Sequence, residues 1–317
     1  MFDDSDIKKK LTLLKKNISY IKKNKSKSIK YIFKNFKLLS GKNIRGLLVL
    51  ITAEGLAGKI NMSVINTAIA IELLHHATLI HDDIIDNSYK RRGDLALNRK
   101  IGYELSVLTG DYLFSYVNRL ILKQNISLLY KIFSDVVKDI CEGEIEEIYN
   151  KNNPFLKEKE YFQIIKKKTA ALIRASVLCG SVLAKNTIDK NLSDYGLYTG
   201  IAFQIKDDIL DISSNSKKLG KPVGCDIKEG KATLPFILAF KNANNREKKI
   251  MKTLFLQKNI KKLTFFIKKN NGINDSLDIA RNYIYKAKKL LNNIRFKNDK
   301  SKIQLERIAD YIINRNY

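Results

Sequence analysis

Two clusters of aspartate carry the clearest chemical signal in this chain of 317 residues. The first aspartate motif is Asp82, Asp83 and Asp86, and the second aspartate motif is Asp207, Asp208 and Asp211. On a helix, positions four apart differ by about 6 Å in height and roughly 40° in direction. The first and last aspartate of each motif therefore share one face. Carboxylates this close repel one another unless a cation binds, which makes each motif a candidate metal site.

The spacing of the carboxylates indicates which metal they suit. Mg²⁺ prefers hard oxygen ligands, takes one or two carboxylates, and shares its other positions with water and phosphate oxygens. One D-D-x-x-D is usually a solvated helix end. Two in one chain, each directly after an apolar run, favour a paired site for Mg²⁺ and a phosphorylated substrate.

Cationic side chains near both motifs fit the same chemistry. Arginine binds phosphate through a planar fork that lysine lacks, and only 11 of the 59 basic residues are arginines. Three of these arginines are candidate phosphate ligands, together with three lysines and one threonine. The candidates are Lys42 and Arg45 in the turn before a helix, Arg91 and Arg92 after the first motif, Lys168 with Thr169 in mid-chain, and Lys221 after the second motif.

All three histidines fall between residues 75 and 81. His75 lies seven residues before Asp82 and shares its helix face, so it could reach a phosphate. A buried structural role stays open for His75 and for His81, while His76 points to another face. The spacing of histidines and cysteines does not fit a zinc site, and neither a Ser-His-Asp triad nor a Walker loop occurs.

The elements that must position these residues are helices almost throughout, because apolar residues recur at i, i+3 and i+4 in most windows. Residues 88–103 are predicted to form a polar connection and residues 214–231 a loop rich in Gly and Lys. No Pro/Gly/Ser-rich linker divides the chain, so we predict one all-α domain. The predicted helices are 6–22, 27–38, 45–57, 63–87, 104–122, 126–149, 158–185, 190–213, 232–243, 246–256, 259–269, 274–292 and 299–315.

Charge at first suggests a polyanion partner, because the formal net charge is +27. Its distribution argues otherwise. Residues 8–30 hold ten lysines and no acid, and residues 241–302 hold 18 basic and 4 acidic residues, so the central part is near balance. We expect solvated surfaces at both ends and no nucleic-acid binding, since no such motif occurs. Contact with an anionic membrane is the one functional use of the basic ends that stays open.

Other features of composition fix the expected compartment. Three cysteines far apart do not suggest a disulfide framework. The start of the chain does not resemble a secretory signal, and no stretch is predicted to span a membrane. We therefore expect a cytoplasmic enzyme.

Several segments together resemble a known family, the trans-polyprenyl diphosphate synthases, and most closely its bacterial octaprenyl branch. The resemblance covers roughly residues 40–240. It rests on IELLHHATLIHDDIIDNSYKRRG at 71–93, TGDYL at 109–113, KTA at 168–170, FQIKDDILD at 203–211 and LGKPVGCDIKEGKATLP at 219–235.

The resemblance implies an isoprenoid-synthase helical bundle with a deep central cavity, in which residues 1–30 are an N-terminal segment, 31–240 the catalytic core and 241–317 C-terminal helices. It implies a homodimer that condenses isopentenyl diphosphate onto an allylic primer such as farnesyl diphosphate, with two or three Mg²⁺ ions. The implied metal ligands are Asp82, Asp86 and Asp207. The implied allylic contacts are Arg91, Lys168, Thr169, Gln204 and Lys221, and those for isopentenyl diphosphate are Lys42, Arg45, His75 and Arg92.

The chain departs from the family pattern at a few positions. The turn that usually reads GGKRxRP is SGKNIRG here, so Asn43 replaces a basic residue and Gly46 a proline. Lys206 stands at a usually apolar position, where it could pair with the second motif, and Cys225 stands where Asp is common. These departures weaken the expectation of full activity.

Chain length is the remaining question. Ala77 and Thr78 lie five and four residues before Asp82, where a bulky aromatic side chain would close the tunnel. Small residues here imply a product beyond the farnesyl and geranylgeranyl class, and we expect octaprenyl diphosphate for quinone side chains. We place the tunnel floor at Phe133 with Ile121, while ordinary core packing is an equal alternative for Phe133. A regulatory subunit of low activity, a shorter-chain synthase and a terpene cyclase are the alternative functions.

Overall fold

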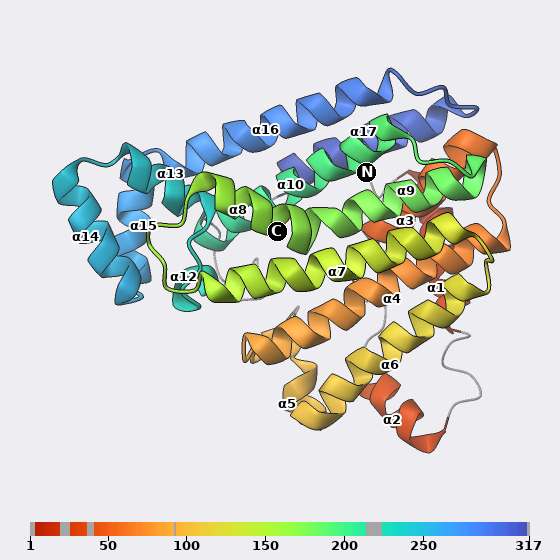
Figure 1. Cartoon of the computed structure of the whole chain (residues 1–317), viewed down its shortest axis with the longest axis horizontal. Coiled ribbons are helices and arrows are strands. Elements are labelled where there is room, and N and C mark those ends of the chain that lie inside the picture. The colour runs from red at the N-terminus through yellow and green to blue at the C-terminus, as the bar shows by residue number, and fades with distance from the viewer. Residues whose placement is uncertain (1–3, 20–25, 37–40, 92, 214–223, 316–317) are drawn as a thin grey trace. The chain divides into compact units, whose positions relative to one another are not determined.

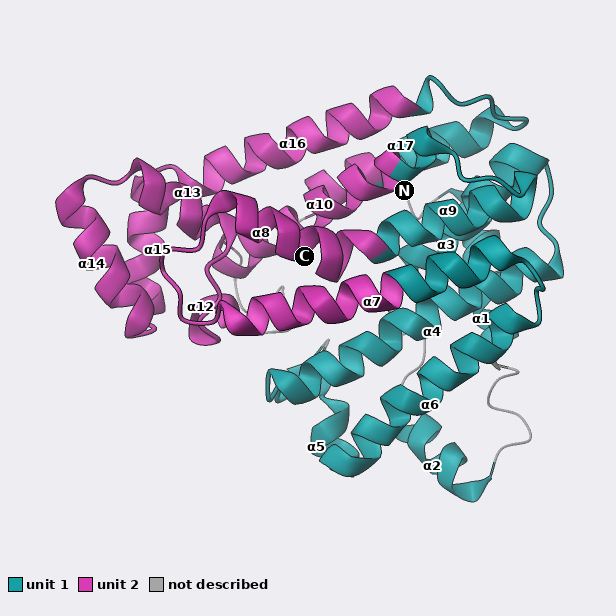
Figure 2. Ribbon diagram, viewed as in Figure 1, with its two compact units in different colours: residues 1–135, 172–193, 291–308 teal, residues 136–171, 194–290, 309–317 magenta. Residues whose placement is uncertain are grey.

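The computed structural model describes residues 4–19, 26–36, 41–91, 93–213 and 224–315. Helices dominate these residues, as predicted (Figure 1). The chain divides into two compact units, coloured separately in Figure 2. Unit 1 comprises residues 1–135, 172–193 and 291–308, and unit 2 comprises residues 136–171, 194–290 and 309–317.

The helices that begin and end in unit 1 come from the first 122 residues of the chain. An antiparallel ribbon of two strands, each two residues long, joins two of these helices, with Lys90 opposite Leu95 and Arg91 opposite Asp94. The elements are α1 (Ser5–Ser19), α2 (Lys27–Asn35), α3 (Ile44–Ala57), α4 (Met62–Ile85), β1 (Lys90–Arg91), β2 (Asp94–Leu95), α5 (Leu97–Ile101) and α6 (Tyr103–Leu122).

The remaining helices lie in unit 2 or contribute residues to both units, as α7, α10 and α17 do. Within unit 2, α15 packs on α13 and α14. The elements are α7 (Ser127–Tyr149), α8 (Glu158–Ile165), the π-helical turn η2 (Lys166–Ala170), α9 (Ala171–Lys185), α10 (Lys190–Ser213), α12 (Cys225–Lys228), α13 (Leu234–Asn242), α14 (Asn245–Leu256), α15 (Ile260–Lys269), α16 (Gly272–Leu291) and α17 (Asp299–Asn314).

The predicted helices therefore exist, with ends shifted by a few residues. The short helices α5 and α12 and the ribbon of β1 and β2 were not predicted from the sequence. Residues 88–103 are not a plain connection, because they hold the ribbon and α5. Part of the predicted 214–231 loop is the short helix α12, and residues 214–223 lie outside the described residues. Elements of two to five residues show no periodicity, so hydrophobic pattern could not reveal them.

Helix α4 is the core of unit 1. Its start is capped by Asn61, whose side chain accepts a hydrogen bond from the Val64 amide at 3.0 Å. Among the described residues it is the one helix long and apolar enough to cross a membrane, but 72% of its apolar window is buried inside the protein. Helices α3 and α6 pack against it. The apolar character of α4 thus reflects its position in the core. The first aspartate motif lies at the C-terminal end of this helix.

The basic N-terminal segment is partly built into this core, which corrects the expectation that it is solvated surface. Ile7 and Leu14 of α1 are fully buried. Lys10 is buried too and lies 2.7 Å from the Glu54 carboxylate of α3, with Asp6 as a second partner. A charge buried this way persists because it is paired, so α1 belongs to the folded unit.

Candidate active site

The first aspartate motif occupies the last turn of α4. Asp82 and Asp86 are partly exposed, whereas Asp83 is buried. The helix ends at Asp86, whose amide donates to the Asp82 carbonyl at 2.8 Å. Asp82 and Asp86 are thus partly accessible at the end of the helix, and the middle aspartate has another task.

That task is to hold Arg91. The guanidinium donates from Nε to Asp83 Oδ1 at 2.8 Å, and Nη2 contacts the same oxygen. The ribbon presents Arg91 to the helix through a turn at Gly93, which has φ +78° and suits a residue without Cβ. The Arg91 side chain has five N–H donors, and its contact with Asp83 uses donors on two nitrogens, Nε and Nη2. Its predicted contact with an allylic diphosphate stays a prediction.

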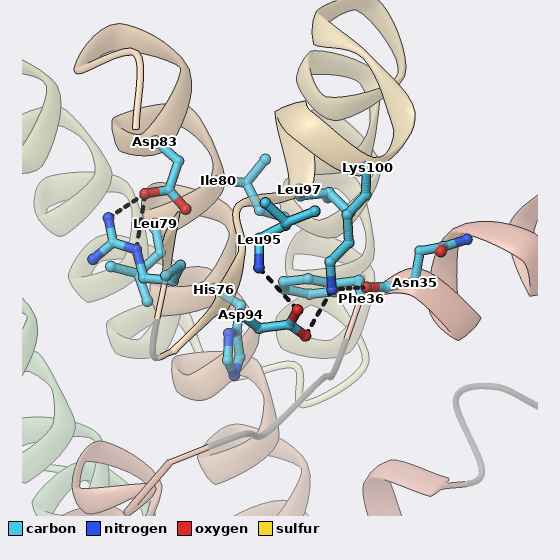
Figure 3. A pocket seen from close by; sticks show the side chains of 11 residues that line it. Asn35, Phe36, His76, Leu79, Ile80, Asp83, Asp94, Leu95, Leu97 and Lys100 are labelled. Carbon is cyan, nitrogen blue, oxygen red and sulfur yellow. Dashed lines mark hydrogen bonds and ion pairs between the residues drawn. The ribbon is translucent and has the colours of Figure 1, made fainter. Parts of the chain in front are cut away.

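A pocket of about 210 Å³ opens on this side of α4 (Figure 3). Asp83 and Arg91 line it together with apolar side chains such as Leu79 and Ile80. A second ion pair, Lys100 with Asp94 at 2.8 Å, lines it as well. The pocket therefore combines an apolar wall with two neutralised charge pairs.

The three histidines have different surroundings. His76 is buried, and its ring meets Phe36 edge-on at 5.4 Å between centroids. His81 stacks on Phe114 and fits over Gly110, where a Cβ would lie 2.1 Å from its Nε2. Packing thus explains His81 and the glycine of TGDYL. His75 is partly buried, and the structure does not test its predicted phosphate contact.

The turn before α3 gives a physical reason for both departures in SGKNIRG. Asn43 has φ +48°, and asparagine tolerates this left-handed conformation better than most residues. The Gly46 amide donates to buried Glu72 Oε1 at 2.7 Å, a bond that proline could not make. Lys42 and Arg45 remain on either side of Asn43, at the N-terminus of α3. The altered residues therefore fit the turn, and its two cationic side chains are kept.

The middle aspartate of the second motif belongs to a buried hydrogen-bond network within unit 2. Asp208 Oδ2 accepts a hydrogen bond from the Tyr161 hydroxyl at 2.6 Å, and Oδ1 accepts one from Gln204 Nε2 at 2.7 Å. Thr169 donates in turn to Gln204 Oε1 at 2.6 Å. Burial raises the pKa of the Asp208 carboxyl to about 7, and burial followed by the Asp208 charge raises the pKa of Tyr161. Thr169 and Gln204, both predicted contacts, thus join one network with the motif.

The last aspartate of the second motif contacts the start of α12. Asp211 accepts hydrogen bonds from the backbone amides of Cys225 and Asp226 at 3.1 and 3.2 Å. Burial, then the Asp211 charge, raises the pKa of Asp226 well above its usual value. Because Cys225 contributes its amide here, replacement of an aspartate at this position leaves the contact intact.

Lys168 lies on the π-helical turn η2, between two acidic partners. Its Nζ is 2.5 Å from Glu144 Oε2 and 2.6 Å from Glu147 Oε2. Glu147 also meets Lys231 at 3.1 Å. Burial alone would raise the pKa of Glu147, but the charges of Lys168 and Lys231 hold it below its usual range. The turn comes close to α7 because Gly143 lacks a Cβ, which would lie 2.5 Å from the Lys168 amide nitrogen.

The first aspartate of the second motif pairs with a residue from the C-terminus. Arg315 Nη2 lies 2.6 Å from Asp207 Oδ1. The sequence suggested Lys206 as the cation, but within the described part of the chain Lys206 shows no ion pair with the motif. Lys206 is buried, and burial followed by the charge of Arg315 lowers its pKa. Lys206 is therefore a core residue beside the motif.

The structure thus brings Arg91 to the first motif, and Gln204 with Thr169 to the second. Arg92 and Lys221 lie outside the described residues. Among the described residues, no three His, Cys, Asp or Glu side chains converge as a ready-made metal cage. Sequence reasoning missed four partners, which are Tyr161, Glu144, Glu147 and Arg315. The acidic run at 142–147 opposite the lysines at 166–168 was the one available signal.

Comparison with known proteins agrees with this arrangement. The family model for polyprenyl synthetase matches residues 24–268. The chain is 34% identical over 281 residues to heptaprenyl diphosphate synthase component 2 of Bacillus subtilis, covering 87% of this chain and 80% of that protein. It is 36% identical over 221 residues to octaprenyl diphosphate synthase of Escherichia coli, covering 69% and 68%.

A solved structure extends the likeness to the fold. The crystal structure of polyprenyl synthase from Caulobacter crescentus, complexed with calcium and isoprenyl diphosphate, superposes with a TM-score of 0.90 at 31% identity. The match covers 98% of this chain and 96% of that one. The fold is that of the isoprenoid synthases, and the chain belongs to the polyprenyl synthetase family of prenyltransferases.

Proposed function

We propose that this protein is a long-chain trans-polyprenyl diphosphate synthase that adds isopentenyl diphosphate units to an allylic diphosphate in the presence of Mg²⁺. The observation that carries the proposal is the pair of aspartate motifs, each at the end of a core helix with cationic side chains beside it. Octaprenyl diphosphate, for a quinone side chain, is the product we favour. The relatives make products of more than one length, so length rests on the tunnel residues of this chain.

The donor set fits Mg²⁺. Asp82 and Asp86 present hard oxygens on one partly exposed face of α4, and the side chain of Asp207 is 42% exposed. Asp83 and Asp208 are buried, and Asp211 accepts two backbone amides. The first three would hold two or three ions, whose remaining ligands come from diphosphate and water. Bound Mg²⁺ would neutralise charge on the departing diphosphate.

The chain's own residues would do the rest. Arg91 and Lys168 are held by carboxylates near the motifs and would donate hydrogen bonds to the allylic diphosphate. The allylic carbon–oxygen bond breaks, and the double bond of isopentenyl diphosphate adds to the resulting cation. The departing diphosphate, which carries the electron pair, takes up the proton that is lost. Apolar helix walls keep water away from the cation.

Elongation by the purified full-length chain tests this proposal. Farnesyl diphosphate, labelled isopentenyl diphosphate and Mg²⁺ should give a labelled, extended product that chelation of the metal abolishes. Reversed-phase thin-layer analysis of the dephosphorylated product gives its length. Failure to extend farnesyl, geranyl or geranylgeranyl diphosphate would contradict the proposal.

The predicted tunnel floor can be tested separately. Phe133 and Ile121 are both buried in unit 1. Phe133→Ala removes most of a large side chain, and we expect products longer by at least one isoprene unit. Leu129→Ala, one turn earlier on α7 and equally buried, is the matched control for a cavity in the same helix. An unchanged product length, with both variants folded, would make Phe133 a packing residue only.

A second candidate function is that of one subunit in a synthase made of two different chains, because one relative is named as component 2 of a heptaprenyl diphosphate synthase. Near the start of α6, three apolar side chains are exposed that a second subunit would cover, with Leu105, Val107 and Leu108 exposed by 40, 41 and 60%. We propose a homodimer through this face. A chain that is inactive alone, but active once a partner from the same genome is added, would favour the heteromeric alternative.

We also propose that unit 2 carries the membrane contact. On α15, Phe265 is 62% exposed, and four exposed lysines stand three or four residues away at 261, 262, 268 and 269. An aromatic side chain among lysines suits the interface of an anionic bilayer, which must receive a polyprenyl product. The enzyme itself would act from the cytoplasm.

Charge reversal tests this contact. Lys261→Glu with Lys262→Glu should weaken binding to phosphatidylglycerol-containing liposomes by at least about tenfold, since each lysine contributes about 1 kcal/mol near such a surface. Lys286→Glu with Lys289→Glu, beside exposed Tyr285 on α16, is the matched control. Equal loss in both variants would indicate net charge alone. Deleting residues 1–30 is not a clean test, because Leu14 is part of the core.

A further inference from the structure

Arg315 is a mostly buried cation that pairs with the second aspartate motif. It follows the end of α17, and its amide donates to the Tyr311 carbonyl at 3.0 Å. Its side chain is only 9% exposed. Burial of a guanidinium needs specific contacts to offset the cost of desolvation.

Three contacts hold the guanidinium on α10. Nη2 lies 2.6 Å from Asp207 Oδ1 and donates to the Phe203 carbonyl at 2.8 Å. The guanidinium carbon also stands 4.0 Å from the centre of the Phe203 ring, within the range of a cation–π contact. The end of the chain is therefore fastened to the first carboxylate of the second motif.

Asp207 is also the carboxylate of this motif best placed to accept a metal. Asp208 is buried in the Tyr161 and Gln204 network, and Asp211 accepts two backbone amides. Asp207 is therefore the ligand we expect for a cation at the second motif, and there the guanidinium already supplies a positive charge. A metal ion bound at either oxygen of this carboxylate would place a second positive charge close to the guanidinium, and the two cations would repel each other there.

From this geometry we propose that Arg315 is an exchangeable counter-cation of the second aspartate motif. It neutralises Asp207 while no metal is bound, and it is displaced when a divalent cation binds, which loosens the C-terminal end of α17. Arg315 is a positioning residue in this scheme. The inference rests on the proposed metal-dependent function, but it concerns metal affinity and chain mobility.

Metal affinity is the first test. Mn²⁺ binding to the full chain, measured by electron paramagnetic resonance and by calorimetry without diphosphate, should be about fivefold tighter in Arg315→Gln than in the parent, because one charge-assisted competitor is lost. Arg307→Gln removes the same charge from an exposed ion pair on the same helix and should leave the affinity unchanged. Equal or weaker binding in Arg315→Gln overturns the proposal.

Hydrogen–deuterium exchange supplies a readout that does not depend on activity. In the parent, Mg²⁺ should speed exchange in the C-terminal peptide that contains Tyr311. Asp207→Asn, which weakens the anchor, should speed it even without metal. If Mg²⁺ slows this exchange or leaves it unchanged, Arg315 is a fixed structural contact and the proposal is wrong.

The two levels of proposal can fail separately. If the parent elongates farnesyl diphosphate but Arg315→Gln leaves Mn²⁺ affinity unaltered, only the role of Arg315 is overturned. If the parent neither binds Mn²⁺ nor elongates, the proposed function fails and the exchange scheme fails with it. Arg315→Lys keeps the charge without the planar fork, so intermediate affinity and a normal fold would support the geometric argument.

Discussion

Asp82→Asn is expected to lower kcat/KM for chain elongation by about a thousandfold or more, because it removes charge from a ligand that would hold Mg²⁺ against the leaving group. The substitution keeps the size of the side chain. Asp82 is partly exposed at the end of α4, so the free energy of unfolding should stay within about 0.5 kcal/mol of the parent. Steady-state elongation assays and thermal unfolding measure the two quantities.

Two neighbours make this prediction specific. Asp135→Asn, in an exposed ion pair on α7, removes one carboxylate elsewhere and should leave elongation unchanged. Asp83→Asn should destabilise the fold as well, because buried Asp83 is the partner of Arg91. If Asp82→Asn retained more than a tenth of the activity, Asp82 would not be a metal ligand.

Ala77→Phe is expected to shorten the product to the farnesyl or geranylgeranyl class. Ala77 is fully buried on α4, five residues and about 7 Å of helix before the first motif, where a ring would occupy the path of a growing chain. The rate of the first condensation should change little, because the metal ligands are untouched. Thin-layer analysis of the product with a geranyl diphosphate primer would show early termination.

The control for Ala77→Phe must separate tunnel blocking from damage to the core. Ala70→Phe, two turns earlier on the same helix and also fully buried, introduces the same side chain into the core at a greater distance from the motif. It should cost stability without producing the short product. A full-length product from folded Ala77→Phe would show that the tunnel does not pass Ala77.

The amino-acid sequence by itself determined the helices and revealed the two aspartate motifs. Long helices have a strong apolar period, and two D-D-x-x-D clusters after apolar runs require few assumptions about tertiary contacts. Lys42 and Arg45 in the turn before α3 could also be identified from the sequence, although the residues between and after them differ from the family pattern.

Tertiary structure decided what each aspartate does. Asp82 and Asp86 stay at the solvent-accessible face, whereas Asp83, Asp207 and Asp208 meet Arg91, Arg315 and Tyr161. Asp207 and Arg315 are more than a hundred residues apart in sequence, so no local pattern links them. The role of a carboxylate depends on its burial and on which donor reaches it, and both are set by how distant helices pack.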